Sequence, residues 1–267
     1  MELRINGVAC ATLMRTPGRD RHLALGFFLT EGWIESAAEV GSLALCARTM
    51  RSKTSRAVDN FSEDNVVDLI PATGVVLRAP DAAQARLGPS VSSCGVCGKR
   101  TIEEVLALTP WRRAGSTQPE APPQNPFPRA VVANIPEQLR GGQKLFEATG
   151  SLHAAGIFDL QGRLLIVEED VGRHNAVDKA VGWAVSSDRV PLGKHGLVVS
   201  GRVSFEIVQK AYRAGIELVA AVSGVSSLAV ELAEQAGITL CGFVRGGSFT
   251  VYAHAGRLSS GPPQHSA

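Results

Sequence analysis

Ionisable residues and glycine are concentrated in one stretch of the chain, Asp170-Val171-Gly172-Arg173-His174-Asn175-Ala176-Val177-Asp178-Lys179. The apolar run Leu164 to Val167 before it predicts a buried strand, and the apolar spacing after it predicts a helix that begins close to His174. A strand followed by the start of a helix presents backbone N–H groups and the positive end of a helix dipole at one place. The stretch is therefore suited to binding an anion.

A Cys-x-x-Cys pair, Cys94 and Cys97, is the second place where chemistry is expected. Such a pair can close a disulfide, supply half of a metal site, or act as a nucleophile and its helper. Adjacent glycines predict an exposed, mobile segment, while Lys99, Arg100 and a following helix favour the thiolate. A thiolate there can accept sulfur as a persulfide and pass it on. The spacing alone does not separate this role from a thioredoxin-like one.

Structural zinc at the cysteine pair is a minority interpretation, because zinc needs two more ligands and the chain has no second close cysteine pair. A histidine such as His153 would have to complete the site. The remaining cysteines, Cys10, Cys46 and Cys241, sit in apolar surroundings and are predicted to be buried small hydrophobic residues.

The composition excludes several classes of protein. Its 267 residues are 45% hydrophobic, which permits a sizeable core, and 27 Lys and Arg nearly balance 25 Asp and Glu. Wholesale binding of nucleic acid or of a membrane surface is therefore not expected. The chain has neither an apolar run long enough to span a bilayer nor the charge order of a signal peptide, so we expect a soluble cytoplasmic protein.

The elements that must position these residues differ between the two halves of the chain. An Asn6-Gly7 turn predicts an opening hairpin, and a helix is expected from about Asp20 to Gly32. Another helix is predicted from Thr101 to Leu108. Six prolines between Pro110 and Pro128 then predict a linker.

Beyond the linker, a helix is predicted from about Pro136 to Ala148, and strands then alternate with helices. This pattern is typical of βαβ units and a largely parallel sheet, made mixed by a first, hairpin-linked strand pair.

Ligands collect at the carboxyl ends of such strands. The predicted ends carry glycine, serine and arginine, which suits phosphates and polar ring edges. The candidate residues at the first two of these ends are Gly172, Arg173, His174, Ser200, Gly201 and Arg202. Gly and Ser are also ordinary turn residues, so any one loop alone would be uninformative. Asp178, four residues after His174, is expected either to orient its imidazole or to make a surface pair.

Several motifs together resemble the FdhD family of formate dehydrogenase accessory proteins, which are sulfur carriers. They cover nearly the whole chain in order, and the cysteine motif combined with the Glu169 to Lys179 block is the most specific part. The matching stretches are Thr16-Pro17-Gly18, Leu25-Gly26-Phe27, Glu31-Gly32, Ser93 to Gly98, Thr149 to Ala155, Glu169 to Lys179, Ser200-Gly201-Arg202, and Gly242 to Ser248 with Tyr252.

The resemblance implies an α/β fold similar to cytidine deaminases, with three layers and a mixed sheet, plus a smaller N-terminal α+β region, in a protein that is usually a dimer. The implied divisions are an N-terminal region 1–109, a Pro-rich linker 110–130, a deaminase-like domain 131–256 and a flexible tail 257–267. A longer linker segment and a short N-terminal extension set this chain apart from the family pattern.

The implied activity is sulfur transfer. A cysteine desulfurase would load Cys94 as a persulfide with Cys97 as its helper. The sulfur would then pass to the molybdenum (or tungsten) bis-guanine-dinucleotide cofactor before the cofactor enters formate dehydrogenase. This cofactor is a bound client, and no permanently bound cofactor or metal is expected. The segment implied to bind it comprises Phe243, Val244, Arg245, Gly246, Gly247 and Ser248.

Two alternatives remain open. A zinc deaminase would carry His-x-Glu before Pro-Cys-x-x-Cys, whereas His153-Ala154-Ala155 lacks the glutamate and the cysteine pair comes earlier in the chain. A cofactor chaperone whose cysteines do no chemistry is the other. The sequence does not fix the metal of the client, the recipient dehydrogenase, the roles of His153 and His174, or whether the cysteine segment closes over the rim.

Overall fold

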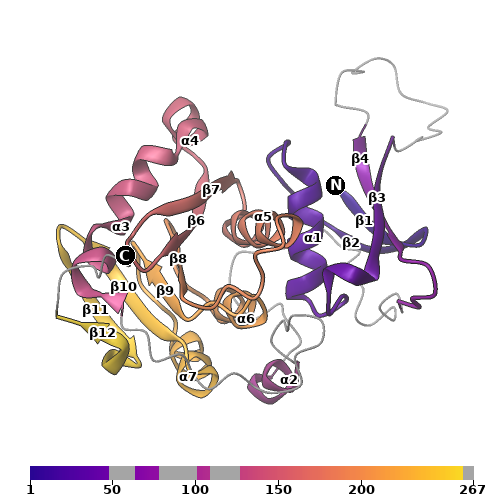
Figure 1. Ribbon diagram of the computed structural model, residues 1–267. Coiled ribbons are helices and arrows are strands. Elements are labelled where there is room, and N and C mark those ends of the chain that lie inside the picture. Colours follow the sequence, from indigo (N-terminus) through magenta and orange to yellow (C-terminus); the bar gives the residue numbers. More distant parts are fainter. Residues whose placement is uncertain (48–63, 78–100, 109–126, 261–267) are drawn as a thin grey trace.

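A computed structural model describes residues 1–47, 64–77, 101–108 and 127–260. Cys94, Cys97 and most of the proline-rich segment lie outside these ranges. The described residues form two larger sheets, a short two-stranded sheet and the helices that pack between and around them (Figure 1).

The N-terminal sheet begins with the predicted hairpin, β1 (Glu2–Ile5) and β2 (Val8–Thr12), which pair in antiparallel fashion. Its turn residues Asn6 and Gly7 have φ of 49° and 81°, the left-handed conformation that an Asn-Gly turn adopts readily. The remaining strands are β3 (Val40–Ala47) and β4 (Asp64–Pro71), in the order β2-β1-β4-β3. The predicted helix that follows the hairpin is confirmed as α1 (Asp20–Thr30).

The larger sheet has the order β11-β10-β9-β8-β6-β7. Only the central strands β8, β9 and β10 are parallel, because β6 is antiparallel to both of its neighbours and β11 is antiparallel to β10. The expected parallel pairing is thus limited to the three central strands of the sheet. The strands are β6 (His153–Asp159), β7 (Leu164–Asp170), β8 (His195–Val199), β9 (Leu218–Ala221), β10 (Thr239–Arg245) and β11 (Ser248–Ala253).

Helices cover both faces of this sheet, which gives three layers. On β8, Val198 packs against the α3 side, while Leu197 and Val199 face the other helices, as the alternation of side chains along a strand requires. The predicted three layers and mixed sheet are present, and the similarity to cytidine deaminases stays a prediction. The helices are α3 (Arg129–Gly142) on one face, and α5 (Arg173–Ser186), α6 (Phe205–Arg213) and α7 (Ser227–Ala236) on the other.

The helix predicted from Pro136 begins seven residues earlier, at Arg129, and a break at Gln143 separates α3 from α4 (Lys144–Thr149). Pro136 lies inside α3, where it removes one backbone donor. The buried stripe of Val132, Ile135 and Leu139 holds the helix on the sheet in spite of this loss.

Two short elements complete the fold. The helix predicted at Thr101 is α2 (Ile102–Ala107), and Thr101 and Glu104 form a reciprocal capping box at its start. Near the C-terminal end, a turn of 3-10 helix (Ala255–Arg257) precedes β12 (Leu258–Ser259). β12 pairs in parallel with β5 (Phe127–Pro128) just before α3, and a second 3-10 turn spans Ala37–Glu39.

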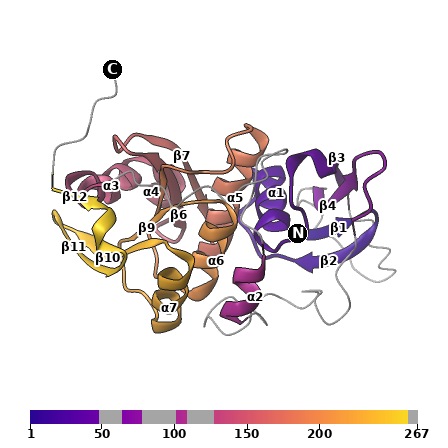
Figure 2. The ribbon, with the colours of Figure 1, turned by 60° about the horizontal axis from the view of Figure 1, so that its bottom comes forward.

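Helices α1 and α5 lie side by side and join the two sheets (Figures 1 and 2). Their contact is close because each helix contributes a glycine: a Cβ atom at Gly26 would lie 1.8 Å from the carbonyl oxygen of Asp178, and one at Gly182 would lie 1.8 Å from that of His22. One hydrophobic core therefore runs from the N-terminal strands through α1 and α5 into the larger sheet.

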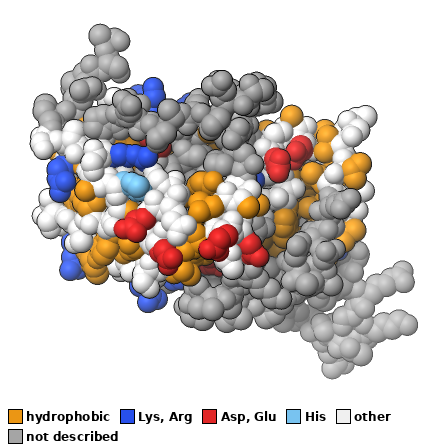
Figure 3. All heavy atoms as spheres, turned by 90° about the horizontal axis from the view of Figure 1, so that it is seen from below, with side chains coloured by type: hydrophobic (Ala, Val, Ile, Leu, Met, Phe, Trp, Pro, Cys, Tyr) orange, Lys and Arg blue, Asp and Glu red, His pale blue; other side chains and the backbone are white. Residues whose placement is uncertain are grey.

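Charged and apolar side chains are unevenly distributed over the described surface. In the view from below, acidic and apolar side chains occupy the middle of the described surface and basic side chains lie mainly towards its margin (Figure 3). Within the described ranges, no helix is both long and apolar enough to cross a membrane.

Candidate functional site

The predicted rim exists: the segments after β8, β9 and β10 meet at one edge of the larger sheet. Backbone hydrogen bonds join them, from Val203 N to the oxygen of Gly224 (3.1 Å), and from Phe243 N near the end of β10 to the oxygen of Ser223 (3.0 Å). Because β6 runs antiparallel to β8, its first residue, His153, comes to the same edge. We use "the rim" for this edge together with the turn from β7 into α5.

His153, Gly201 and Arg173 are in contact at the centre of the rim. A Cβ atom at Gly201 would lie 3.2 Å from Nδ1 of His153 and 3.7 Å from Cδ of Arg173, so glycine allows both side chains to lie against the backbone. The neighbouring Ser200 accepts a hydrogen bond from Ala154 N at 2.9 Å, which leaves its own hydroxyl proton available. The sequence names His153 as a possible zinc ligand and as part of the Thr149 to Ala155 motif, and it leaves the role of this histidine open. The antiparallel direction of β6 is what brings His153 to the rim.

The rim is cationic. Burial, and then the charges of Arg173, His174 and Arg202, lower the pKa of His153, so its imidazole is neutral near pH 7. Burial and the nearby Arg202 also lower the pKa of Arg173, although this guanidinium remains charged. The Nε of Arg173 is buried and has no hydrogen-bond partner in the described part of the chain. A buried donor of this kind favours an acceptor such as a phosphate oxygen.

His174 is held by a different partner from the one expected. Its Nε2 lies 2.9 Å from Oε2 of Glu206 and 3.1 Å from Oγ of Ser204. Because both groups meet the same ring nitrogen, they do not form a serine–histidine–acid relay, in which the two partners must use opposite nitrogens. The pairing of His174 with Asp178 is therefore wrong.

Asp178 turns away from the rim into the core, where it is 0% exposed. Its Oδ1 accepts hydrogen bonds from Thr30 Oγ1 (2.8 Å) and Lys210 Nζ (2.9 Å), which tie α1, α5 and α6 together. Burial raises the pKa of Asp178, and Lys210 opposes that shift. The close approach of α1, which local spacing does not reveal, buries the face of α5 that carries Asp178.

The segment Phe243 to Ser248 lies at the other end of the rim, where β10 turns into β11. Phe243 has φ of 52° and is 43% exposed, and its ring lies over Gly224, where a Cβ atom would be 3.0 Å from Cζ. The guanidinium of Arg245 is 6.0 Å from the centre of that ring. Gly246 and Gly247 make the turn with positive φ, and Ser248 is exposed, whereas Val244 is buried in the core. Five of the six residues are thus accessible at the rim, and their binding role stays a prediction.

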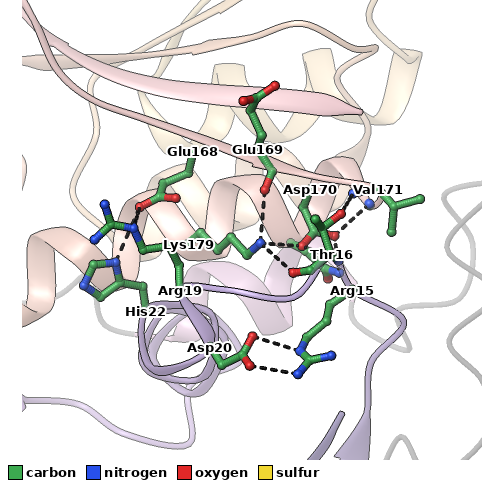
Figure 4. Close-up of polar contacts among 12 residues, drawn as sticks. Arg15, Thr16, Arg19, Asp20, His22, Glu168, Glu169, Asp170, Val171 and Lys179 are labelled. Carbon is green, nitrogen blue, oxygen red and sulfur yellow. Dashed lines mark hydrogen bonds and ion pairs between the residues drawn. The ribbon is translucent and has the colours of Figure 1, made fainter. Parts of the chain in front are cut away.

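An N-terminal loop, Arg15 to Arg19, is fastened to the rim where β7 turns into α5 (Figure 4). Thr16 N donates to Asp170 Oδ2 at 3.0 Å, and Val171 N donates to Thr16 Oγ1 at 2.9 Å. Lys179 reaches the same place and donates to the backbone oxygens of Thr16 and Glu169, both at 3.0 Å. Asp170 and Lys179 therefore support the rim from inside, a role that sequence reasoning missed.

The two catalytic candidates, Cys94 and Cys97, lie outside the described residues. Cys10 and Cys241 are buried, as predicted, and burial raises their pKa to about 11 and about 12 respectively. Cys46 lies in β3. Among the described residues, no group of three His, Cys, Asp or Glu side chains could hold a metal ion.

Comparison with known proteins gives one consistent result. The sequence model of the FdhD/NarQ family matches residues 1–259. A relative from Mycobacterium tuberculosis named sulfur carrier protein FdhD is 44% identical over 263 residues, covering 97% of this chain and 89% of that protein. Another of the same name from Streptomyces avermitilis is 45% identical over 259 residues, covering 97% of this chain and 86% of that protein.

A crystal structure of a candidate formate dehydrogenase accessory protein from Desulfotalea psychrophila has a similar fold. Its TM-score is 0.69 at 20% identity, and the alignment covers 97% of this chain and 87% of that one. Fold and site define an α/β protein with a cationic rim along one edge of its mixed sheet. The chain belongs to the FdhD/NarQ family, which confirms the resemblance seen in its motifs.

Proposed function

We propose that this protein is a sulfurtransferase that carries sulfur for the maturation of formate dehydrogenase. Cys94 accepts sulfane sulfur from a cysteine desulfurase, and the sulfur passes to a molybdenum (or tungsten) bis-guanine-dinucleotide cofactor held at the rim of a homodimeric protein. The observation that carries the proposal is the combination of a Cys-x-x-Cys pair with a cationic rim in a chain 44% identical to a named sulfur carrier.

The rim residues fit a phosphate-bearing client. Burial and then the charge of Arg202 lower the pKa of Arg173, and a bound dianion would relieve the repulsion between the two guanidinium groups. The neutral imidazole of His153 adds a donor and an acceptor without adding charge. Gly201, Gly246 and Gly247 allow a ligand to approach the backbone closely. These groups bind and orient the client, and the client supplies the metal that receives the sulfur.

Each transfer of one sulfur atom requires both cysteines and a dithiol reductant. The thiolate of Cys94 attacks the outer sulfur of the donor persulfide, whose S–S bond breaks and whose own thiolate leaves. Cys97 then attacks Sγ of Cys94, the bond to the terminal sulfur breaks, and hydrosulfide leaves with the electron pair towards the client. The product is a Cys94–Cys97 disulfide, which a dithiol reductant must reduce before the next cycle.

The direct test is formate dehydrogenase activity in cells that lack their own FdhD protein and carry this chain. Wild type is expected to restore activity, and Cys94→Ala is expected to abolish it, while Cys10→Ala serves as the matched control. If Cys94→Ala restored activity fully while Arg245→Ala did not, the protein would be a binding chaperone whose cysteines do no chemistry. Stoichiometric zinc in the purified protein would also contradict sulfur carriage, since zinc occupies the thiolates.

A further inference from the structure

Glu206 places a carboxylate at the cationic rim. The residue lies in the first turn of α6, its side chain is 13% exposed, and its Oε2 is 2.9 Å from Nε2 of His174. Ser204, which comes just before α6, has its Oγ 3.1 Å from the same nitrogen. A negative charge here weakens the attraction between the rim and a phosphate. Glu206 therefore acts against the anion binding that the neighbouring cations favour.

Two polar contacts between α5 and α6 hold Glu206 beside the rim. His174 and Asp178 lie one helical turn apart on α5. Glu206 and Lys210 lie one turn apart on α6. The first members of the two pairs meet at 2.9 Å, and so do the second members, Oδ1 of Asp178 and Nζ of Lys210. Because the second contact is a buried ion pair, it ties the two helices together one turn below the rim.

The charge of Glu206 acts on Arg173. Burial and then the charge of Arg202 lower the pKa of Arg173, and Glu206 opposes both by raising it. The carboxylate therefore offsets part of the repulsion between the two guanidinium groups. The buried Nε of Arg173 still has no hydrogen-bond partner among the described residues, so this donor stays available to a phosphate. A phosphate gains less by binding there, because Glu206 already stabilises the cation and repels the anion.

We propose that Glu206 limits the affinity of the rim for phosphate groups, so that the protein can release the client that it carries. A carrier needs such a limit, because a client that is held too tightly is not handed on. Glu206 determines affinity and takes no part in the sulfur steps. This inference rests on the proposed function, because it takes the client to be a phosphate-bearing molecule at the rim.

The test is calorimetric titration of inorganic pyrophosphate into the purified full-length chain. Glu206→Gln is expected to bind pyrophosphate about tenfold more tightly than wild type, the size of one charge interaction near a protein surface. Glutamine keeps an oxygen that can accept from Nε2 of His174, so the main change is the loss of charge. Glu206→Asp keeps the charge and is expected to bind like wild type. Glu231→Gln, an exposed change on α7 with the same effect on net charge, is the matched control and is expected to bind like wild type.

A gain in affinity separates this role from a structural one, since damage to the rim would weaken binding. Weaker or unchanged pyrophosphate binding in Glu206→Gln, the same gain in Glu231→Gln, or no pyrophosphate binding by any variant would overturn the inference. Should Glu206→Gln fail to fold, as judged by circular dichroism, Glu206→Ala is expected to show the gain, because it removes the same charge.

Release of the client is tested in the cells that lack their own FdhD protein. Glu206→Gln is expected to activate formate dehydrogenase less than wild type, because a tighter complex dissociates more slowly. Tighter pyrophosphate binding together with full activation would overturn the role in release. The proposed function fails separately, if Cys94→Ala activates formate dehydrogenase or if wild type takes up no sulfur.

Discussion

The Nζ of Lys179 lies 2.7 Å from Oδ2 of Asp170, with side chains that are 2% and 0% exposed, directly beneath the turn that opens the rim. Asp170 also accepts hydrogen bonds from Gly172 N and from the Asn175 side chain, each at 2.9 Å. The pair therefore joins the last residue of β7, the first turn of α5 and the N-terminal loop through Thr16. It is fully enclosed and satisfied by hydrogen bonds, which is the condition for a buried ion pair to hold a local structure.

Replacing Lys179 by Met is expected to lower the free energy of unfolding by about 3–5 kcal/mol, because it leaves the Asp170 carboxylate buried without its counter-ion. The measurement is urea unfolding followed by circular dichroism. Arg163→Met is the control. It removes an ion pair with Asp159 in which the arginine side chain is 77% exposed, and the carboxylate keeps its hydrogen bonds from Gln161 N and Arg163 N. Surface pairs contribute at most about 1 kcal/mol. Equal losses in the two variants would contradict a structural role for the buried pair.

Gly182→Ala is expected to destabilise the protein by about 1–3 kcal/mol or more, because the added Cβ atom would meet the backbone of α1 and push the two helices apart. Gly141→Ala in α3 is the matched control. A Cβ atom there would meet nothing within 4 Å, so alanine is expected to stabilise by up to about 1 kcal/mol through higher helix propensity. Thermal unfolding of both variants tests this: the melting temperature should fall in Gly182→Ala and rise in Gly141→Ala, and a change in the same direction in both would contradict the account.

These contacts explain which parts of the fold the sequence could predict. Local signals located the Asn6-Gly7 hairpin, the helix that begins at Thr101 and the strand–helix repeat after His195, since each depends on neighbouring residues. The packing of α1 on α5 depends on residues more than a hundred positions apart, such as Gly26 and Asp178. For the same reason, the spacing pairs Asp178 with His174, either to orient the imidazole or as a surface pair, although Asp178 lies in the core.

Cys10 and Cys241 are expected to resist alkylation in the native protein at neutral pH. Burial raises their pKa to about 11 and about 12, so hardly any thiolate forms at either position. Brief treatment with iodoacetamide, followed by peptide mass spectrometry, should label Cys94 and Cys97 first. Rapid labelling of Cys10 or Cys241 before unfolding would contradict their assignment as inert core residues.

His153 is expected to make stability depend on pH. Burial and neighbouring cations hold its pKa in the folded protein below that of the unfolded chain, so protonation favours unfolding. Its contribution is fully present above the unfolded pKa of about 6.5 and is lost as the pH falls through that value towards the lower, folded pKa. The free energy of unfolding of wild type relative to His153→Gln should therefore fall between about pH 7.5 and about pH 5.5. A flat difference would show that His153 is solvated as in a peptide.

Gly201→Val is expected to weaken anion binding without unfolding the protein. Its side chain would press on the His153 ring and the Arg173 side chain, which already lie within 3.2 Å and 3.7 Å of a Cβ position there. Calorimetric titration with inorganic pyrophosphate measures the effect, and circular dichroism checks the fold. Unchanged pyrophosphate affinity would place the anion site elsewhere on the molecule.

Only the part of the candidate site that lies at the ends of strands could be predicted from the sequence. The glycine, serine and arginine residues at the ends of β8 and β10 identified the rim because parallel strands end at one edge. A pocket lined by Arg140, Gln143, Phe146 and His153 was not predicted, since it depends on the break between α3 and α4 and on the hydrogen bonds from the start of α4 to Glu169. Cys94 and Cys97 could be assigned chemistry only from their spacing and from the resemblance to sulfur carriers.

Sulfur loading of Cys94 is the claim on which the account depends, and intact mass spectrometry tests it most directly. The reduced protein is incubated with a cysteine desulfurase and cysteine, and its mass is measured before and after addition of a dithiol reductant. Wild type and Cys10→Ala are expected to gain the mass of one sulfur atom, which the reductant removes, and Cys94→Ala is expected to gain none. The same reducible adduct on Cys94→Ala, or no adduct on wild type, would contradict the account.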